Sequence, residues 1–86
     1  MHELSIALDV CRIAAERVGP EAVGNVVTVG LEVGDDAGVE VDNLEFCLEA
    51  LLTQPPFKAA RPVIDRRPGD ELRVTYLEVD DDDPDD

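Results

Sequence analysis

The stretch that decides the fold is NVVTVGLEV, which covers residues 25–33. It is rich in β-branched residues, and apolar side chains occupy every second position, as expected for a strand with a buried face. The alternation predicts one face that carries the odd-numbered residues from Val27 to Val33. Val26 and the even-numbered residues are then expected on the opposite face.

Helical patterns lie on both sides of this strand. Between Glu3 and Val18, apolar residues recur at three- and four-residue steps, and the Gly-Pro pair that follows ends the pattern. A second helix is predicted to begin at Asp42, which has the spacing of a capping box with Glu45. Phe46 falls outside the apolar stripe of this second helix.

The rest of the chain has the pattern of a β-hairpin. Residues 61–66 and 71–79 are the predicted strands, and between them lies the segment Arg67-Pro68-Gly69-Asp70. Proline and glycine occupy the two central positions that a type II turn prefers. The sequence therefore predicts that the last two strands pair with each other.

The predicted order of elements is αβαββ, an α/β (α+β two-layer) fold with two helices on one face of a three-stranded mixed sheet. The strand–helix–strand unit predicts a parallel crossover, and the hairpin adds an antiparallel strand. Leu77, Val79, Ile64 and Val26 are then expected on the second sheet face. This face is apolar enough to require cover by a loop or a partner, and a homodimer through it is one such arrangement.

Charge divides the chain of 86 residues into two parts. The formal net charge is −14, and residues 80–86 consist of six Asp and one Pro. Residues 1–79 are the predicted domain, with 15 acidic and 7 basic residues and a net charge of −8, and residues 80–86 are predicted to be a disordered acidic tail. So negative a chain is not expected to bind nucleic acid or an anionic membrane surface. No leader or membrane-spanning segment is recognised in the sequence, so a cytoplasmic location is expected.

Few residues of the chain suit catalysis, and we expect no enzyme. His2 is the single histidine. His2, Ser5 and Asp9 would all lie along one helix, where nothing would orient the His2–Ser5 pair as a catalytic triad requires. Cys11 and Cys47 both fall on apolar stripes. They are interpreted as small buried hydrophobic residues rather than as a metal site shared between the helices.

The N-terminus carries the pattern that points to chemistry. The amine of Met1, the backbone nitrogen of His2 and the His2 imidazole can close two adjacent chelate rings on one metal ion. The backbone nitrogen or the carboxylate of Glu3 can supply a fourth donor. Nitrogen donor sets of this kind favour nickel(II) or copper(II) over magnesium or calcium. The simpler alternative is that His2 is one more polar residue on a frayed helix end.

Four segments together resemble the HypA/HybF nickel metallochaperones of NiFe-hydrogenase maturation. The most specific is MHELSIA at residues 1–7, and the others are residues 26–34, 44–49 and 69–74. The resemblance spans almost all of residues 1–79. It implies an αβαββ nickel domain, which is the order that periodicity predicts independently.

The same resemblance implies a function and a set of ligands. Nickel would be bound by the amine of Met1, by His2 and by nearby backbone nitrogens, with Glu3 supporting the site. The ion would be delivered to the NiFe-hydrogenase large subunit with the help of a HypB-type GTPase. The family places a zinc domain with two CxxC pairs between the last two strands, where this chain has only residues 66–69, so no zinc is expected. A metal-free adaptor of the maturation machinery is the alternative.

Overall fold

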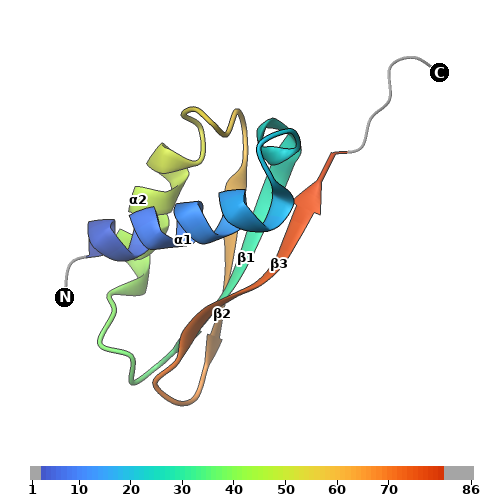
Figure 1. The fold of residues 1–86 in the computed structure, drawn as a ribbon. Helices are drawn as coiled ribbons and strands as arrows, with labels where there is room; N and C mark the ends of the chain where they lie inside the picture. Colours follow the sequence, from blue (N-terminus) through green and yellow to red (C-terminus); the bar gives the residue numbers. More distant parts are fainter. Residues whose placement is uncertain (1–2, 81–86) are drawn as a thin grey trace.

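The computed structural model describes residues 3–80. The elements follow the order α1 (Glu3–Val18), a short 3₁₀ turn (Val23–Asn25), β1 (Val26–Gly34), α2 (Val41–Leu51), β2 (Arg61–Arg67) and β3 (Leu72–Val79). The αβαββ order is confirmed (Figure 1). The observed bounds of α1 are the predicted ones, and each strand begins or ends within one residue of its prediction.

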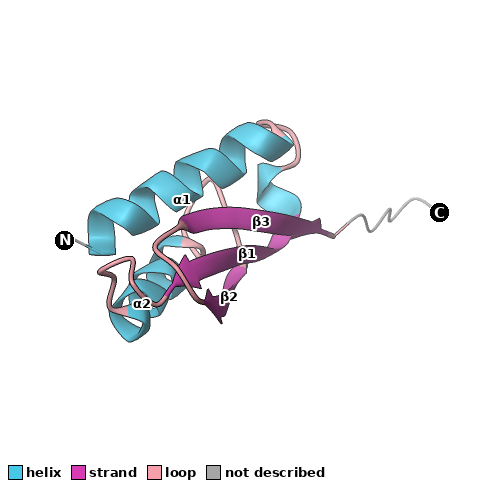
Figure 2. Ribbon diagram, turned by 90° about the horizontal axis from the view of Figure 1, so that it is seen from below, coloured by secondary structure: helices cyan, strands magenta, loops and turns pink. Residues whose placement is uncertain are grey.

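Both helices pack onto the same face of the sheet and share a single core. Ala7, Val10 and Ala14 bury one side of α1, and Leu44 and Leu48 bury one side of α2. These side chains form one cluster with residues of the α2–β2 connection and with core-facing residues of the strands: Phe57 and Ala60, and Val26, Val29, Leu31, Val33 and Val74. The two-layer arrangement is confirmed, with α1 lying lengthwise along the layer (Figure 2).

The sheet order corrects the predicted hairpin. The strands run β2-β1-β3, so β1 separates the two strands that were expected to pair. β1 is parallel to β2 and antiparallel to β3. The physical reason is burial: β1 is buried at every position except Val27 and Glu32, whereas most side chains of β2 and β3 are exposed. The most apolar strand therefore takes the centre, and the charged strands take the edges.

The connection between β2 and β3 passes over the end of β1. Gly69 has φ +106°, as the second central residue of a type II turn requires. The turn is bonded to the end of β1, because Gly34 N–H donates to Glu71 O at 2.7 Å and Asp36 N–H donates to Gly69 O at 2.8 Å. A Cβ at Gly34 would lie 2.2 Å from the Gly69 carbonyl oxygen. Glycine is therefore needed where the turn crosses β1.

Two β-bulges change which side chains face the core. The pairing of β1 with β3 shifts register once between Val26 and Thr28 and again between Gly30 and Leu31. Each bulge inverts the alternation of one strand. Val26 is consequently buried in the core instead of sharing a face with Thr28, and Leu77 packs against the core while Tyr76 does not.

The second sheet face is therefore not the apolar surface that the sequence predicted. Val26 is in the core, and Ile64 and Leu77 pack against it. The second face instead carries a short apolar row, in which the Tyr76 ring lies over Gly30 beside Val63. Charged residues follow on the same face, including Arg73, which pairs with Glu32 at 3.2 Å. Val79, the fourth residue expected there, is 39% exposed, and a homodimer through this sheet face stays a prediction.

The predicted tail falls almost wholly outside the described residues. Only Asp80 is described, and its N–H donates to Asn25 O at 2.7 Å, which extends the contact between β1 and β3 by one residue. Within residues 3–80, no helix is long and apolar enough to cross a bilayer.

Candidate metal centre

The predicted metal site lies at the N-terminal end of α1. Met1 and His2 lie outside the described residues, so Glu3 is the one predicted ligand that the structure places. Glu3 opens α1 directly after His2 and belongs to the first turn of the helix. Glu3 is therefore the described residue that adjoins the predicted chelate in the sequence.

Both oxygens of the Glu3 carboxylate accept hydrogen bonds from the beginning of α2. Glu40 N–H donates to Oε2 at 3.0 Å, and the Asn43 side-chain amide donates to Oε1 at 3.2 Å. The N-terminal ends of the two helices therefore meet at this carboxylate, although they are 37 to 40 residues apart in the sequence. In Figure 1 the start of α1 lies beside the start of α2.

Glu3 completes the N-terminus of α2 from outside that helix. The predicted N-cap at Asp42 is wrong: the helix begins at Val41, Glu40 is the N-cap, and the Glu40 side chain makes no capping bond. In a capping box, the residue three positions after the N-cap accepts a bond from the N-cap N–H. Here Asn43 holds that position, but its side chain donates a hydrogen bond to Glu3. The Glu3 carboxylate accepts the bond from the N-cap N–H of Glu40 instead.

These bonds favour the ionised form of Glu3. The hydrogen bond from the Glu40 N–H is the main cause that lowers the pKa of Glu3 below its ordinary value of 4.5, and the Asn43 amide contributes in the same direction. Donors that bind the charged form of a carboxyl group always act this way. The carboxylate is therefore an anion at neutral pH and an acceptor with both oxygens in use.

The two cysteines lie in α1 and α2, on the sides of these helices that pack against the core. Cys11 and Cys47 are free thiols, half-buried, and packed against the core. Burial raises the pKa of Cys11 to about 11, so this thiol stays protonated at neutral pH and is a poor metal ligand. Among residues 3–80, no group of three or more His, Cys, Asp or Glu side chains is placed to hold a metal ion.

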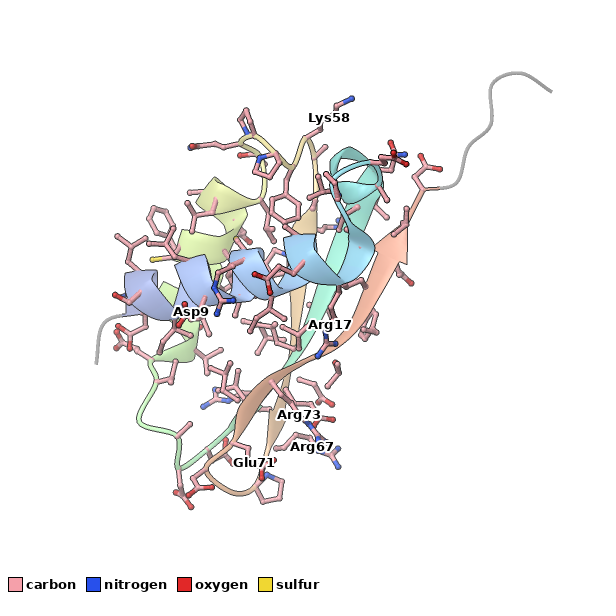
Figure 3. All side chains as sticks on the ribbon, in the orientation of Figure 1. Asp9, Arg17, Lys58, Arg67, Glu71 and Arg73 are labelled. Atoms are coloured by element: carbon pink, nitrogen blue, oxygen red, sulfur yellow. The ribbon has the colours of Figure 1, made fainter. Side chains whose placement is uncertain are left out.

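The cations of the described chain lie mainly away from this end. Figure 3 shows Arg67 and Arg73 at the opposite side of the molecule, near the β2–β3 connection. Arg17, in the last turn of α1, reaches β3, and its guanidinium donates to Val74 O at 3.4 Å. The described part of the α1 N-terminus therefore presents acceptors, with Glu3 and the N-cap residue Glu40 side by side.

Sequence reasoning did not find Asn43 or Glu40. Neither residue lies in a local pattern that indicates a contact with the N-terminus, because the partner is in another helix. One indirect signal was present: Asn43 follows Glu40 by the three-residue spacing of a capping box.

Comparisons with known proteins give a consistent result. The family described as "Hydrogenase/urease nickel incorporation, metallochaperone, hypA" matches residues 1–72. A hydrogenase maturation factor HypA from Geobacter metallireducens is 42% identical over 69 residues, which cover 80% of this chain and 60% of that protein. The protein of the same name from Chlorobaculum parvum is 38% identical over 65 residues, or 76% of this chain and 58% of that protein.

A third protein of this name, from Azotobacter chroococcum, is 38% identical over 69 residues and is covered to 61% of its length. The chain thus spans about 60% of the length of the curated relatives that it matches. The matched segment begins with the predicted chelate, since the family match starts at Met1.

Proposed function

Because the chain belongs to the HypA family, we propose that it binds Ni(II) through Met1, His2 and Glu3 and delivers the ion during NiFe-hydrogenase maturation. The family is described by nickel incorporation and not by catalysis, which agrees with the expectation that the protein is no enzyme. Nickel is the cargo in this proposal. The receiving partners would be the NiFe-hydrogenase large subunit and a HypB-type GTPase.

The observation that carries the proposal is the position of Glu3 in the first turn of α1. The first four N–H groups of a helix have no acceptor within the helix, so the nitrogens of the opening residues are available to a metal without loss of helical hydrogen bonds. The chelate predicted for Met1 and His2 is attached directly to a residue whose side chain is fixed to α2. The proposed chelate thereby directly precedes an anchored residue.

The positive end of the helix dipole opposes a cation at this site by about 0.3–1 kcal/mol. Two effects favour a bound cation. The coordinating nitrogens lose protons when they bind it, and the nearby Glu3 carboxylate carries a negative charge. Nitrogen ligands suit nickel, copper and zinc, so the donor set supports a late transition metal and not a hard cation.

The proposal is tested by nickel titration of the protein with its native N-terminus. We expect about one nickel ion per chain near pH 7.5, and release below about pH 6, because the amine and the imidazole must both lose protons to bind. His2→Ala should weaken binding by at least about tenfold, since it removes one of the nitrogen donors. Unchanged affinity in calorimetry of His2→Ala would refute the chelate.

A blocked N-terminus is the second arm of this test. An extension of one or two residues before Met1 moves the free amine away and should weaken binding about as strongly as His2→Ala. Ser5→Ala is the matched control, because Ser5 is an exposed first-turn residue outside the proposed donor set. An adaptor that works without metal would show no difference between these forms in nickel content.

A further inference from the structure

We infer that Asn43 is a positioning residue of the proposed nickel site: its amide holds the Glu3 carboxylate on α2 and so fixes the beginning of α1. The inference rests on the proposed function for its nickel readout. It names a residue in the second helix, far from the N-terminus in sequence, as part of the machinery that presents the cargo.

The first argument is that the carboxylate already has a structural partner for each oxygen. Oε2 accepts the bond from Glu40 N–H at 3.0 Å and Oε1 accepts the bond from the Asn43 amide at 3.2 Å. A carboxylate that turned to a metal ion would leave the N-cap N–H of α2 without this acceptor, and the Glu40 side chain makes no capping bond that could replace it. The backbone nitrogen of Glu3 carries no such conflict.

The second argument is that apolar packing secures the first turn of α1 only in part. Leu4 is 53% exposed and Ser5 is exposed, while Ile6 is half-buried and packs against the core. Full burial begins at Ala7 and continues with Val10 and Ala14. Helix ends with few buried contacts open readily. The hydrogen bonds of Glu3 are therefore the contacts that hold the beginning of this turn on α2.

The third argument concerns the partner helix. Leu44, next to Asn43, is fully buried, and its N–H donates to Glu40 O at 3.0 Å as the first bond of α2. The donors that bind Glu3 thus belong to a well-anchored helix start. Removal of the Asn43 amide should free the Glu3 side chain without unfolding α2.

The test compares Asn43→Ala with Asn43→Gln, which keeps an amide donor, and with Gln54→Ala. Gln54 is an exposed amide just beyond the other end of α2, so its loss controls for a polar group removed near the same helix. We expect Asn43→Ala to weaken nickel binding about three- to tenfold, because the metal must then order a looser turn. Asn43→Gln should recover part of the loss, and Gln54→Ala should bind as the native chain does.

Spectra of the nickel complex provide a readout that a general loss of stability does not change. If Asn43 acts by position and is not a ligand, the ligand-field bands of bound nickel stay the same in Asn43→Ala once the site is saturated. A shifted spectrum in Asn43→Ala overturns the inference, because it shows that the donor set itself has changed. Equal affinities of Asn43→Ala and the native chain overturn it as well.

Hydrogen exchange of the metal-free protein separates this inference from the proposed function. We expect the Glu40 amide and the first turn of α1 to exchange at least severalfold faster in Asn43→Ala, with the amides of β1 unchanged. A native chain that takes up no nickel refutes the proposed function, and the exchange experiment still decides whether Asn43 holds the first turn. Unchanged exchange at Glu40 overturns that role whatever nickel does.

Discussion

The two ends of α1 are held by different kinds of contact. At the C-terminal end, Val18 packs against the core, and Gly19, with φ +87°, closes the helix through a bond from its N–H to Ala15 O at 2.9 Å. At the N-terminal end, Ile6 packs against the core, Leu4 is largely exposed, and the polar bonds of Glu3 join the turn to α2. Both ends are thus partly buried, and the N-terminal end depends in addition on a few replaceable hydrogen bonds to another helix.

This difference suits the proposed carrier. Apolar burial involves many atoms, and its loss affects the whole domain. An exposed hydrogen bond contributes much less than a buried apolar cluster, so it can be changed without loss of the fold. The end at which the chelate is proposed can therefore loosen or tighten while the scaffold stays intact.

The largest expected effect comes from truncation of a side chain in the buried core. Leu48 is fully buried between α2 and the sheet, so Leu48→Ala should lower the free energy of unfolding by about 2–5 kcal/mol. Phe46→Ala is the matched control on the same helix, because the Phe46 side chain is 69% exposed, and it should cost less than about 0.5 kcal/mol. Urea unfolding measures both, and similar losses would contradict the assigned core.

A smaller effect is expected where the β2–β3 connection crosses β1. Gly34→Ala places a Cβ against the backbone of Gly69, which cannot turn aside, and should cost about 1–3 kcal/mol. Gly24→Ala is the control, because its Cβ would meet the flexible end of the Lys58 side chain at 3.3 Å. Thermal unfolding of the two variants compares them, and a stable Gly34→Ala protein would contradict the crossing.

The smallest expected effect comes from the hydrogen bonds of the Glu3 carboxylate. The pKa of Glu3 is lowered in the folded protein, so its hydrogen bonds stabilise the fold above the ordinary value of 4.5, and this contribution disappears as pH falls through the folded pKa. The midpoint of thermal unfolding should thus be higher for the native chain than for Glu3→Gln at pH 7. The difference should vanish in acid, once the pH has fallen below the lowered pKa of Glu3. A difference that stays constant with pH would exclude the Glu3 carboxylate as its source.

Local patterns in the sequence predicted the elements well and their pairing less well. The apolar periodicity of residues 3–18 predicted α1 with its observed bounds, and Phe46 is exposed as its position outside the stripe indicated. The alternation in β1 failed at Val27, because a bulge there shifts the pairing with β3 by one residue. A bulge depends on the partner strand, and no local pattern in this sequence indicated it.

The candidate site shows the same division. The residues that suit a nickel chelate are adjacent in sequence, so Met1, His2 and Glu3 could be proposed from the chain alone, and for all three this stays a prediction. The role of the Glu3 side chain could not be proposed in this way. Its donors lie in α2, and the local capping rule pointed to Asp42 instead of Glu40.

The amino-acid sequence alone determined where the helices and strands form and which nitrogen donors stand together at the N-terminus, because both depend on residues a few positions apart. Tertiary structure decided that β1 lies between β2 and β3, that Leu77 faces the core, and that Glu3 binds the start of α2. These outcomes depend on contacts between residues about 40 to 50 positions apart. Such contacts are selected by the burial of the whole core and not by any local pattern.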